Sequence, residues 1–269
     1  MARVKKKIAR LPNVAMGLTL IQPNRVTETS FKGFTLVMHK IFTAIQVKLQ
    51  DAVQHSMDNK EISQLDLFSQ DTNDIFIRLE FSSVIKSKTH YDDVRKALLA
   101  MAGLTAEIPY FDPNGKKMLL MTGFLRAVIP EKADFSSDIE IRIDKKLANL
   151  LIEIDKKPDG KPINFTKFSY EIAQAATCLH TPPIYKILSA WKSKEFYKIR
   201  YSEFRNYLGI TEDQYKKFSD FKRRVLLPVL ADLINVSDVW FGMEHDGFKT
   251  KKNGEIWLLF KIVKSVNNL

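Results

Sequence analysis

The residues YKKFSDFKRRVLLPVLADLIN, 215–235, form the most informative segment of this chain. Their apolar members recur at steps of three and four, which place them on one face of a helix. These members are Phe218, Phe221, Val225, Val229 and Leu233. Ser219 is the predicted N-cap, because its hydroxyl can accept a hydrogen bond from a free amide of the first turn. Pro228 lacks an amide hydrogen and clashes with the preceding turn, so we expect the helix to kink or divide there.

Three basic side chains leave this helix together near its start, away from the apolar face. They are Lys222, Arg223 and Arg224. A buried rear face, a basic front and an outward-facing N-terminus are the features of a helix that reads the DNA major groove. The alternative is an ordinary amphipathic helix whose charged face meets only water. The rest of the chain favours the first interpretation.

The whole chain is basic, with 42 lysines and arginines against 31 aspartates and glutamates, a formal net charge of +11 over 269 residues. A basic protein of this size most often binds a polyanion, either nucleic acid or an anionic membrane surface. No apolar run is long enough to span a bilayer. The first residues carry positive charge without the compact apolar core of a signal peptide. We therefore expect a cytoplasmic protein whose residues 1–21 form a flexible basic arm.

Two halves are separated by DKKPDGKP, residues 155–162, which holds two prolines, a glycine and charges but nothing apolar. The first half, residues 22–155, begins with the turn QPNRVTET. Its patterns then predict, in order, a helix at 34–54, a strand at 75–81, a helix at 91–102, a hairpin from 104–110 and 117–129, a strand at 139–143 and a helix at 145–154. The hairpin turn, FDPNGK, is rich in residues that favour turns.

The second half, residues 163–269, contains the basic helix. Its patterns predict helices at 165–178, 184–192 and 201–208, a strand at 196–199, and strands at 239–245 and 256–263 joined by the turn DGFKTKKNGE. Gly209 follows one helix in the usual position of a C-terminal glycine. Both halves fit a winged-helix plan, in which one helix enters the groove and a β-hairpin wing lies on the backbone. We expect an α+β fold of two tandem winged-helix domains, similar to diverged copies of one module.

Catalytic signatures are missing from the sequence. Gly160 and Lys161 are followed by Pro162, so no phosphate-binding loop is formed, and the five histidines are scattered without a metal-binding pair. Cys178 is the single cysteine, which excludes an intrachain disulfide and a cysteine-based zinc site. The arrangements needed by rolling-circle nickases and tyrosine recombinases do not occur either. We expect a protein that is not an enzyme, with no catalytic residues, no metal and no cofactor.

A family resemblance adds to this interpretation. The segment FSDFKRRVLLPVLADLIN, residues 218–235, is similar to the recognition helix of iteron-binding plasmid replication initiators. The segments PIYKILSAWKS (183–193), FYKIRYSEFRNYLGI (196–210) and SDVWFGMEHD (237–246) fit the family in order and spacing, and QPNRVTET (22–29) resembles the residues before its first helix. The resemblance covers most of the chain, and it is specific in the second domain and looser in the first. Where relatives carry acid-Pro-Ala after the arginines, this chain has Leu227-Pro228-Val229, which changes packing more than base contact.

The resemblance implies binding to short direct repeats, called iterons, at a plasmid origin. The second domain would read bases in the major groove, and the first would contact neighbouring backbone and form a dimer interface. Monomers would distort the origin and recruit the host initiator and the replicative helicase, and dimers would repress the initiator's own gene. Competing interpretations are a double winged-helix transcriptional repressor without initiator activity and an initiator encoded by a phage or transposon.

The candidate DNA-binding residues fall into three groups. Those at the second-domain helix are Lys216, Lys217, Ser219, Asp220, Lys222, Arg223 and Arg224. Those on the wing are Lys249, Lys251 and Lys252, and those in the first domain are Lys86, Lys88, Arg95 and Lys96. Arginine suits base reading because its planar fork can hold guanine O6 and N7 together. Lysines suit phosphate contacts.

A short apolar island, QLDLF, lies within the polar residues 56–74. Its residues Gln64, Leu65, Asp66, Leu67 and Phe68 resemble the linear motif by which bacterial proteins bind the replicative sliding clamp. In such a motif a glutamine amide fixes the start, and a leucine and a Leu-Phe pair fill an apolar pocket; the segment must be exposed and extended. The alternative is that Leu65, Leu67 and Phe68 fold onto the core of their own domain. The sequence leaves both alternatives open.

Overall fold

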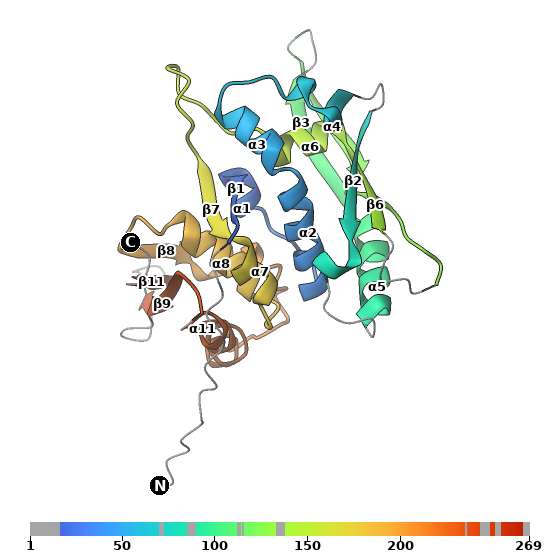
Figure 1. Ribbon diagram of the computed structural model, residues 1–269. Coiled ribbons are helices and arrows are strands. Elements are labelled where there is room, and N and C mark those ends of the chain that lie inside the picture. The colour runs from blue at the N-terminus through green and yellow to red at the C-terminus, as the bar shows by residue number, and fades with distance from the viewer. Residues whose placement is uncertain are drawn as a thin grey trace.

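The computed structural model describes residues 17–69, 73–84, 90–111, 114, 116–132, 138–234, 236–242, 248–250 and 254–265. These residues form helices and small antiparallel sheets arranged in two lobes (Figure 1). Each lobe has its own buried apolar cluster. The first cluster extends from Val26 to Ile154, and the second combines Leu20 with residues between Phe168 and Ile262. The fold is α+β with two cores, as the sequence predicts.

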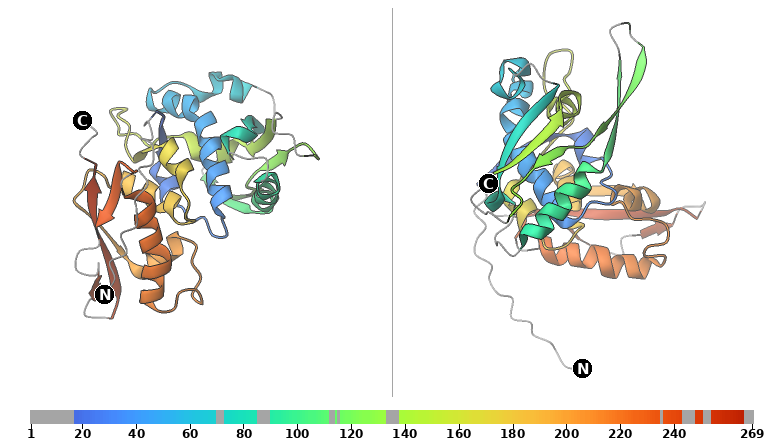
Figure 2. Two further views of the ribbon diagram at one scale, coloured as in Figure 1. Left: turned by 60° about the horizontal axis from the view of Figure 1, so that its bottom comes forward. Right: turned by 90° about the vertical axis from the view of Figure 1, so that its right-hand side faces the viewer.

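The first lobe packs helices against a three-stranded sheet. Its described helices are α1 (Asn24–Thr27), α2 (Leu36–Lys48), α3 (Gln50–Met57), α4 (Asp66–Ser69), α5 (Tyr91–Ala102) and α6 (Lys145–Ile152). Its described strands are β2 (Asp74–Glu80), β3 (Thr105–Phe111), β4 (Lys117–Gly123), β5 (Arg126–Val128) and β6 (Asp138–Asp144). Strands β2, β6 and β5 form the sheet in that order. Strands β3 and β4 form the expected hairpin, which projects from the lobe (Figure 2).

The helix predicted at 34–54 is divided into α2 and α3 at Leu49. The side chain of Gln50 gives a physical reason, because it pairs with the backbone of Ile21. Its amide accepts from the Ile21 N–H at 2.7 Å and donates to the Ile21 carbonyl at 3.0 Å. A tertiary contact to a strand from before the helix therefore coincides with the break. The pattern of apolar residues within the helix could not reveal it.

The strand predicted at 117–129 is also divided, into β4 and β5. Strand β4 pairs with β3, whereas β5 pairs with β6 of the main sheet. Between them, the Phe124 ring lies 5.8 Å from the rings of both Phe34 and Phe42, and Leu125 is buried. The chain changes sheets here because both apolar side chains enter the core.

The second lobe is built on a sheet whose central strand is β11. Its described helices are α7 (Tyr170–Ala175), α8 (Thr181–Ala190), α9 (Tyr201–Tyr207), α10 (Phe218–Phe221) and α11 (Leu227–Leu233). Its described strands are β7 (Phe165–Ser169), β8 (Phe196–Arg200), β9 (Val239–Gly242), β10 (Phe248–Thr250) and β11 (Ile256–Lys264). Strand β11 pairs with β8 on one side and with β9 and β10 on the other. The β10–β11 hairpin occupies the position of the expected wing.

The helix predicted at 165–178 is wrong over its first residues, which form strand β7. This strand pairs antiparallel with β1 (Thr19–Pro23), so that Leu20 lies opposite Phe168. Leu20 is fully buried in the second core. Residues 19–21 therefore belong to a strand and not to the flexible arm that we expected, because their partner lies far along the chain. Residues 1–16 of that arm lie outside the described residues.

The segment 155–162 lies between the two cores, as predicted for a boundary. Lys156 and Pro162 form an isolated antiparallel bridge, and Gly160 adopts a φ of 81° in the turn between them. Such a left-handed conformation strains residues with a side chain, so glycine suits this position. Asp155 forms an ion pair with Arg25, which ties the segment to the first lobe.

Polar side chains connect the lobes where α2 lies beside α7 and α8 (Figure 1). Gln174 of α7 donates a hydrogen bond to the Lys40 carbonyl at 2.8 Å. The buried Lys186 of α8 donates to the Gln46 side-chain oxygen of α2 at 2.8 Å. Gln46 in turn donates to the Gln22 side chain of β1. The two lobes thus share a buried hydrogen-bond network. None of the helices described here has the length and apolar character needed to span a bilayer.

Candidate nucleic-acid interface

The candidate interface is built on α9, the connection 208–217, and the basic helix that follows. Phe221, Val225 and Val229 are fully buried, and Leu233 is nearly so. The ring centroid of Phe221 lies 5.1 Å from that of Tyr201 and 6.3 Å from that of Phe204, so the helix packs directly on α9. The predicted apolar face is confirmed. Its burial fixes which side of the helix faces solvent.

The helix begins at Phe218, so Ser219 is not its N-cap. The residue at the cap is Lys217, and among the described residues no side chain caps this end. The Lys217 carbonyl accepts from the amides of Asp220 and Phe221 at 3.0 and 3.2 Å. Phe218 packs edge-on against Tyr201 with centroids 5.5 Å apart. Burial of Phe218 therefore fixes the helix start, and Ser219 is left exposed in the first turn.

Pro228 divides the helix as predicted. A π-helical turn spans Lys222–Leu226 between α10 and α11, and the Leu227 amide bonds to the Lys222 carbonyl five residues back. The wider turn accommodates the proline, which has no amide of its own and would clash with a regular preceding turn. Both arginines of the basic run lie in this turn. Their directions are therefore set by π-helical and not by α-helical geometry.

The basic side chains gather at the front of this helix. Arg223, Arg224, Lys216 and Lys217 are exposed, and Lys222 and Asp220 are half-buried. The Arg223 guanidinium forms an ion pair with Asp220, with a nitrogen–oxygen distance of 3.0 Å. The predicted set is thus brought together within residues 216–224, opposite the buried face. This basic front matches the arrangement that a groove-reading helix needs.

The wing contains the second group of candidates. Lys249 lies in β10 opposite Trp257 of β11. Lys251 and Lys252 lie outside the described residues, and so do Lys86 and Lys88 of the first lobe. Arg95 and Lys96 are exposed on α5. The structure therefore places Arg95 and Lys96 on a different lobe from the basic helix.

Two cations near the wing were missed in the sequence. The Lys198 ammonium lies 4.8 Å from the ring centroid of Trp257, and the Arg200 guanidinium lies 5.4 Å from the same centroid. Both side chains extend from β8, which pairs with β11 at the base of the wing. Alternation within FYKIR was the available signal, because it places both cations on one face of the strand.

Comparison with protein families identifies the chain. The family described as "Initiator Replication protein, WH1" matches residues 19–189, and the family described as "Initiator Rep protein, WH2" matches residues 201–262. The chain belongs to the initiator Rep protein family. It is a DNA-binding initiator of plasmid replication with two tandem winged-helix domains. No curated protein matches the chain.

The family ranges differ from the boundaries expected from the sequence. The first range begins at β1 and continues through most of α8, whereas the two cores divide between Ile154 and Phe168. Strand β1 and helices α7 and α8 thus fall in the first range while contributing to the second core. These elements bind the two winged-helix domains of the Rep initiator to one another.

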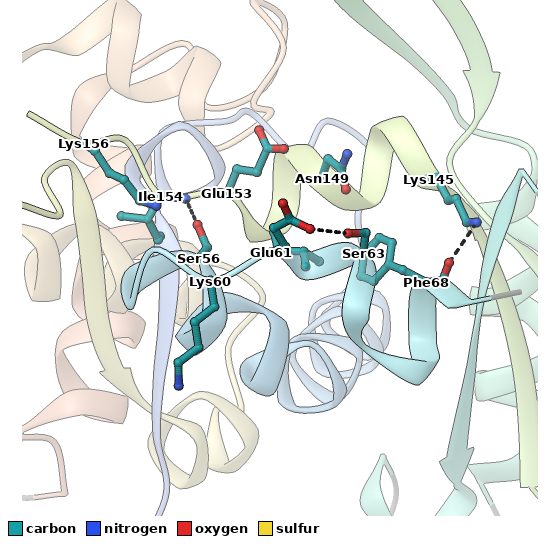
Figure 3. A pocket seen from close by; sticks show the side chains of 11 residues that line it. Ser56, Lys60, Glu61, Ser63, Phe68, Lys145, Asn149, Glu153, Ile154 and Lys156 are labelled. Atoms are coloured by element: carbon teal, nitrogen blue, oxygen red, sulfur yellow. Dashed lines mark hydrogen bonds between the residues drawn. The ribbon is translucent and has the colours of Figure 1, made fainter. Parts of the chain in front are cut away.

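The segment QLDLF is folded against the first lobe. Leu65, Leu67 and Phe68 are half-buried and pack on the first core, between a 3-10 turn (Ile62–Gln64) and α4. The Lys145 ammonium donates to the Phe68 carbonyl at 3.2 Å. Figure 3 shows Phe68 and Ser63 facing Asn149 and Glu153 of α6 across a cavity of about 610 Å³. The folded conformation supports the core interpretation of these residues.

Metal binding finds no site in this Rep initiator. Among the described residues, no three histidine, cysteine, aspartate or glutamate side chains gather closely enough to hold a metal ion. His39 and His180 both lie buried near the junction of the lobes. Burial, and then the neighbouring Lys186 and His180, lowers the pKa of His39 to about 3, and burial lowers that of His180 to about 4. Both histidines are therefore neutral at physiological pH.

Proposed function

We propose that this Rep initiator binds tandem iterons at its plasmid origin and reads them with Arg223 and Arg224. The basic front over residues 216–224 carries this proposal, because it stands opposite a fully buried face in a winged-helix domain. Arginine can pair with both acceptors of guanine in the major groove. Lys216, Lys217 and Lys222 would add phosphate contacts, with Ser219 and Asp220 beside them.

The wing and the first domain would supply sequence-independent contacts. Lys249, Lys251 and Lys252 would contact phosphates flanking the groove, and Lys86, Lys88, Arg95 and Lys96 would contact the neighbouring backbone. Each such contact displaces condensed counterions from DNA and makes affinity dependent on salt. Repeats bound in this way would be opened by distortion, and the bound protein would recruit the host initiator and replicative helicase in the bacterial cytoplasm.

The direct test is protection of DNA that flanks the gene. The purified protein should protect tandem repeats of about two helical turns and should bind a scrambled duplex much more weakly in matched salt. Equal affinity for both duplexes would contradict iteron binding. A plasmid carrying only the repeats should replicate when the gene is supplied in trans. Repeat binding without replication would instead favour the repressor alternative.

We expect the free protein to dimerise through its first domain, and the dimer to repress the initiator's own gene. Among the described residues, Leu99 of α5 and Met121 of β4 are 75% and 70% exposed, more than any other large apolar side chain. Their burial in a dimer would contribute to its stability. Sedimentation should show a concentration-dependent dimer that Leu99→Glu weakens, while Ile256→Glu in the second domain leaves it intact. A monomer at every accessible concentration would contradict the expectation.

A clamp-binding role for QLDLF is proposed with a defined test. Leu67 and Phe68 pack on the core, so clamp binding would require Gln64–Phe68 to unfold locally first. The Leu67→Ala, Phe68→Ala double variant should lose binding to purified clamp while DNA affinity is kept. Removing these half-buried side chains should also lower stability by about 1–3 kcal/mol.

Ile62→Ala is the matched control, because Ile62 packs on the same core outside the motif. It should lower the melting temperature while leaving clamp binding unchanged. Equal clamp binding by the double variant and the wild type would return Leu65, Leu67 and Phe68 to the core and remove Gln64 and Asp66 from any interface.

A further inference from the structure

Arg205, near the end of α9, is a basic residue of the candidate interface that points into the protein. Its Nη1 donates to the Tyr201 hydroxyl at 3.1 Å and to the Tyr215 carbonyl at 3.0 Å. Its Nη2 donates to the carbonyls of Thr211 and Gln214, both at 2.5 Å. A guanidinium has five N–H donors. Four of those on Arg205 are therefore committed within the domain.

The acceptors of Arg205 lie in the connection that leads into the basic helix. Three of them are backbone carbonyls of residues 211–215, which converge on the one guanidinium. Tyr215 adopts a φ of 47°, a left-handed conformation that is unfavourable for a tyrosine. Such a residue persists only where its surroundings hold it. The bond from Arg205 to the Tyr215 carbonyl is such a restraint, next to Lys216 and Lys217.

Arg205 also connects to the first turn of the basic helix through Tyr201. Its guanidinium carbon lies 5.5 Å from the Tyr201 ring centroid. The opposite partners of that ring are Phe218 and Phe221, with centroids 5.5 and 5.1 Å away. The guanidinium, the tyrosine and the helix start thus form one packed unit. A change at Arg205 would reach both the connection and the helix.

We infer that Arg205 is a positioning residue, which fixes residues 211–217 and thereby aims the basic front at the groove without binding DNA itself. The inference rests on the proposed base reading by Arg223 and Arg224. Lysine cannot replace Arg205 in this role, because an ammonium is a point charge with three donors and cannot span four acceptors of a planar fork. Arg205→Lys therefore keeps the charge and removes the geometry.

The test compares wild type, Arg205→Lys, Arg205→Ala and Lys217→Ala on the repeat and on a scrambled duplex over a range of salt. Arg205→Lys should lose about tenfold in affinity for the repeat. It should keep the affinity for scrambled DNA and the salt slope, because no phosphate contact is lost. Lys217→Ala should instead reduce the slope by about 0.9.

A second measurement separates positioning from general stability. Millimolar guanidinium chloride should restore repeat binding by Arg205→Ala relative to the same concentration of sodium chloride, because the free cation can occupy the vacated fork. Restoration is not expected for Arg223→Ala, whose side chain must reach a base. Hydrogen exchange of the amides at 211–217 should be faster in Arg205→Lys than in wild type.

Two results would overturn the inference. One is repeat affinity of Arg205→Lys equal to that of wild type. The other is equal loss on repeat and scrambled DNA, which would make Arg205 a phosphate contact or a general stability residue. Failure of the proposed function looks different, since wild type itself would then not prefer the repeat.

Discussion

Replacing Arg224 with alanine is expected to weaken binding to the cognate repeat by about 1–3 kcal/mol, and to change binding to unrelated DNA much less. Arg224 is exposed at the front of the basic helix, in the π-helical turn. A guanidinium there can meet both acceptors of one guanine, and alanine leaves those acceptors unpaired in the interface. The loss therefore falls on the repeat and not on DNA in general.

Arg223→Ala should follow the same pattern with a somewhat smaller loss. In the free protein its guanidinium is paired with Asp220 at 3.0 Å, and this pair must open or rearrange before a base can be read. An exposed pair of this kind contributes about 0–1 kcal/mol. Asp220→Ala, which removes the competing carboxylate, is therefore expected to tighten repeat binding by a similar small amount in the presence of Arg223.

Competition between repeat and scrambled duplexes in matched salt measures these effects. Neutralising Lys249, Lys251 and Lys252 together is the control, because wing contacts to phosphate would weaken both duplexes and flatten the salt slope by about 0.9 for each true contact. An arginine variant that binds the repeat as tightly as wild type would rule out base reading by that residue. An unchanged slope in the wing variant would remove the wing from the interface.

Local sequence patterns were sufficient for some elements of the fold. Helix α5 begins and ends where its apolar period predicts, with Val94, Leu98 and Met101 buried. Pro228 interrupts the basic helix for a reason contained in its own ring. Strand β7 was misread as helix because its partner, β1, precedes it by more than 140 residues. The pairing of Leu20 with Phe168 depends on tertiary structure, which no local period records.

The candidate interface divides in the same way. The exposed run Lys222 to Arg224 could be predicted, since charges opposite a regular apolar face must meet solvent. The role of Arg205 could not, because it depends on carbonyls that a turn brings around the guanidinium. Likewise, the position of Lys198 over Trp257 depends on the pairing of β8 with β11. Side chains that act through backbone acceptors or strand partners leave little trace in composition.

The buried Lys186 gives the junction of the lobes an unusual pH dependence. Its ammonium lies 4.8 Å from the ring centroid of Phe168 and 5.4 Å from that of Phe42, and it donates to Gln46. Burial lowers the pKa of Lys186 from 10.5 to about 7. His39 and His180 have lower pKa values still and are neutral in this range. Lys186 is thus a group whose titration near neutral pH differs between folded and unfolded chains.

The sign of the effect follows from proton binding. Between about pH 7 and 10.5 the unfolded chain keeps the proton on Lys186, whereas the folded chain has released it. The unfolded state therefore binds more protons, and the free energy of unfolding should rise with pH in this window. The contribution of one such group is at most about 1.4 kcal/mol per pH unit. Below about pH 7 both states are protonated, and the contribution is constant.

Lys186→Met removes this contribution while keeping most of the side-chain volume. Its stability relative to wild type should fall by roughly 2–3 kcal/mol between about pH 7 and pH 9, because only the wild type gains as its lysine loses the proton. Loss of the bond to Gln46 shifts the variant by a constant amount and leaves the slope difference unchanged. Denaturant unfolding at several pH values measures the slopes, with the exposed Lys48→Met as the control that should follow wild type. Parallel slopes for Lys186→Met and wild type would mean that Lys186 stays charged within the junction, held by the Gln46 oxygen and the faces of Phe42 and Phe168.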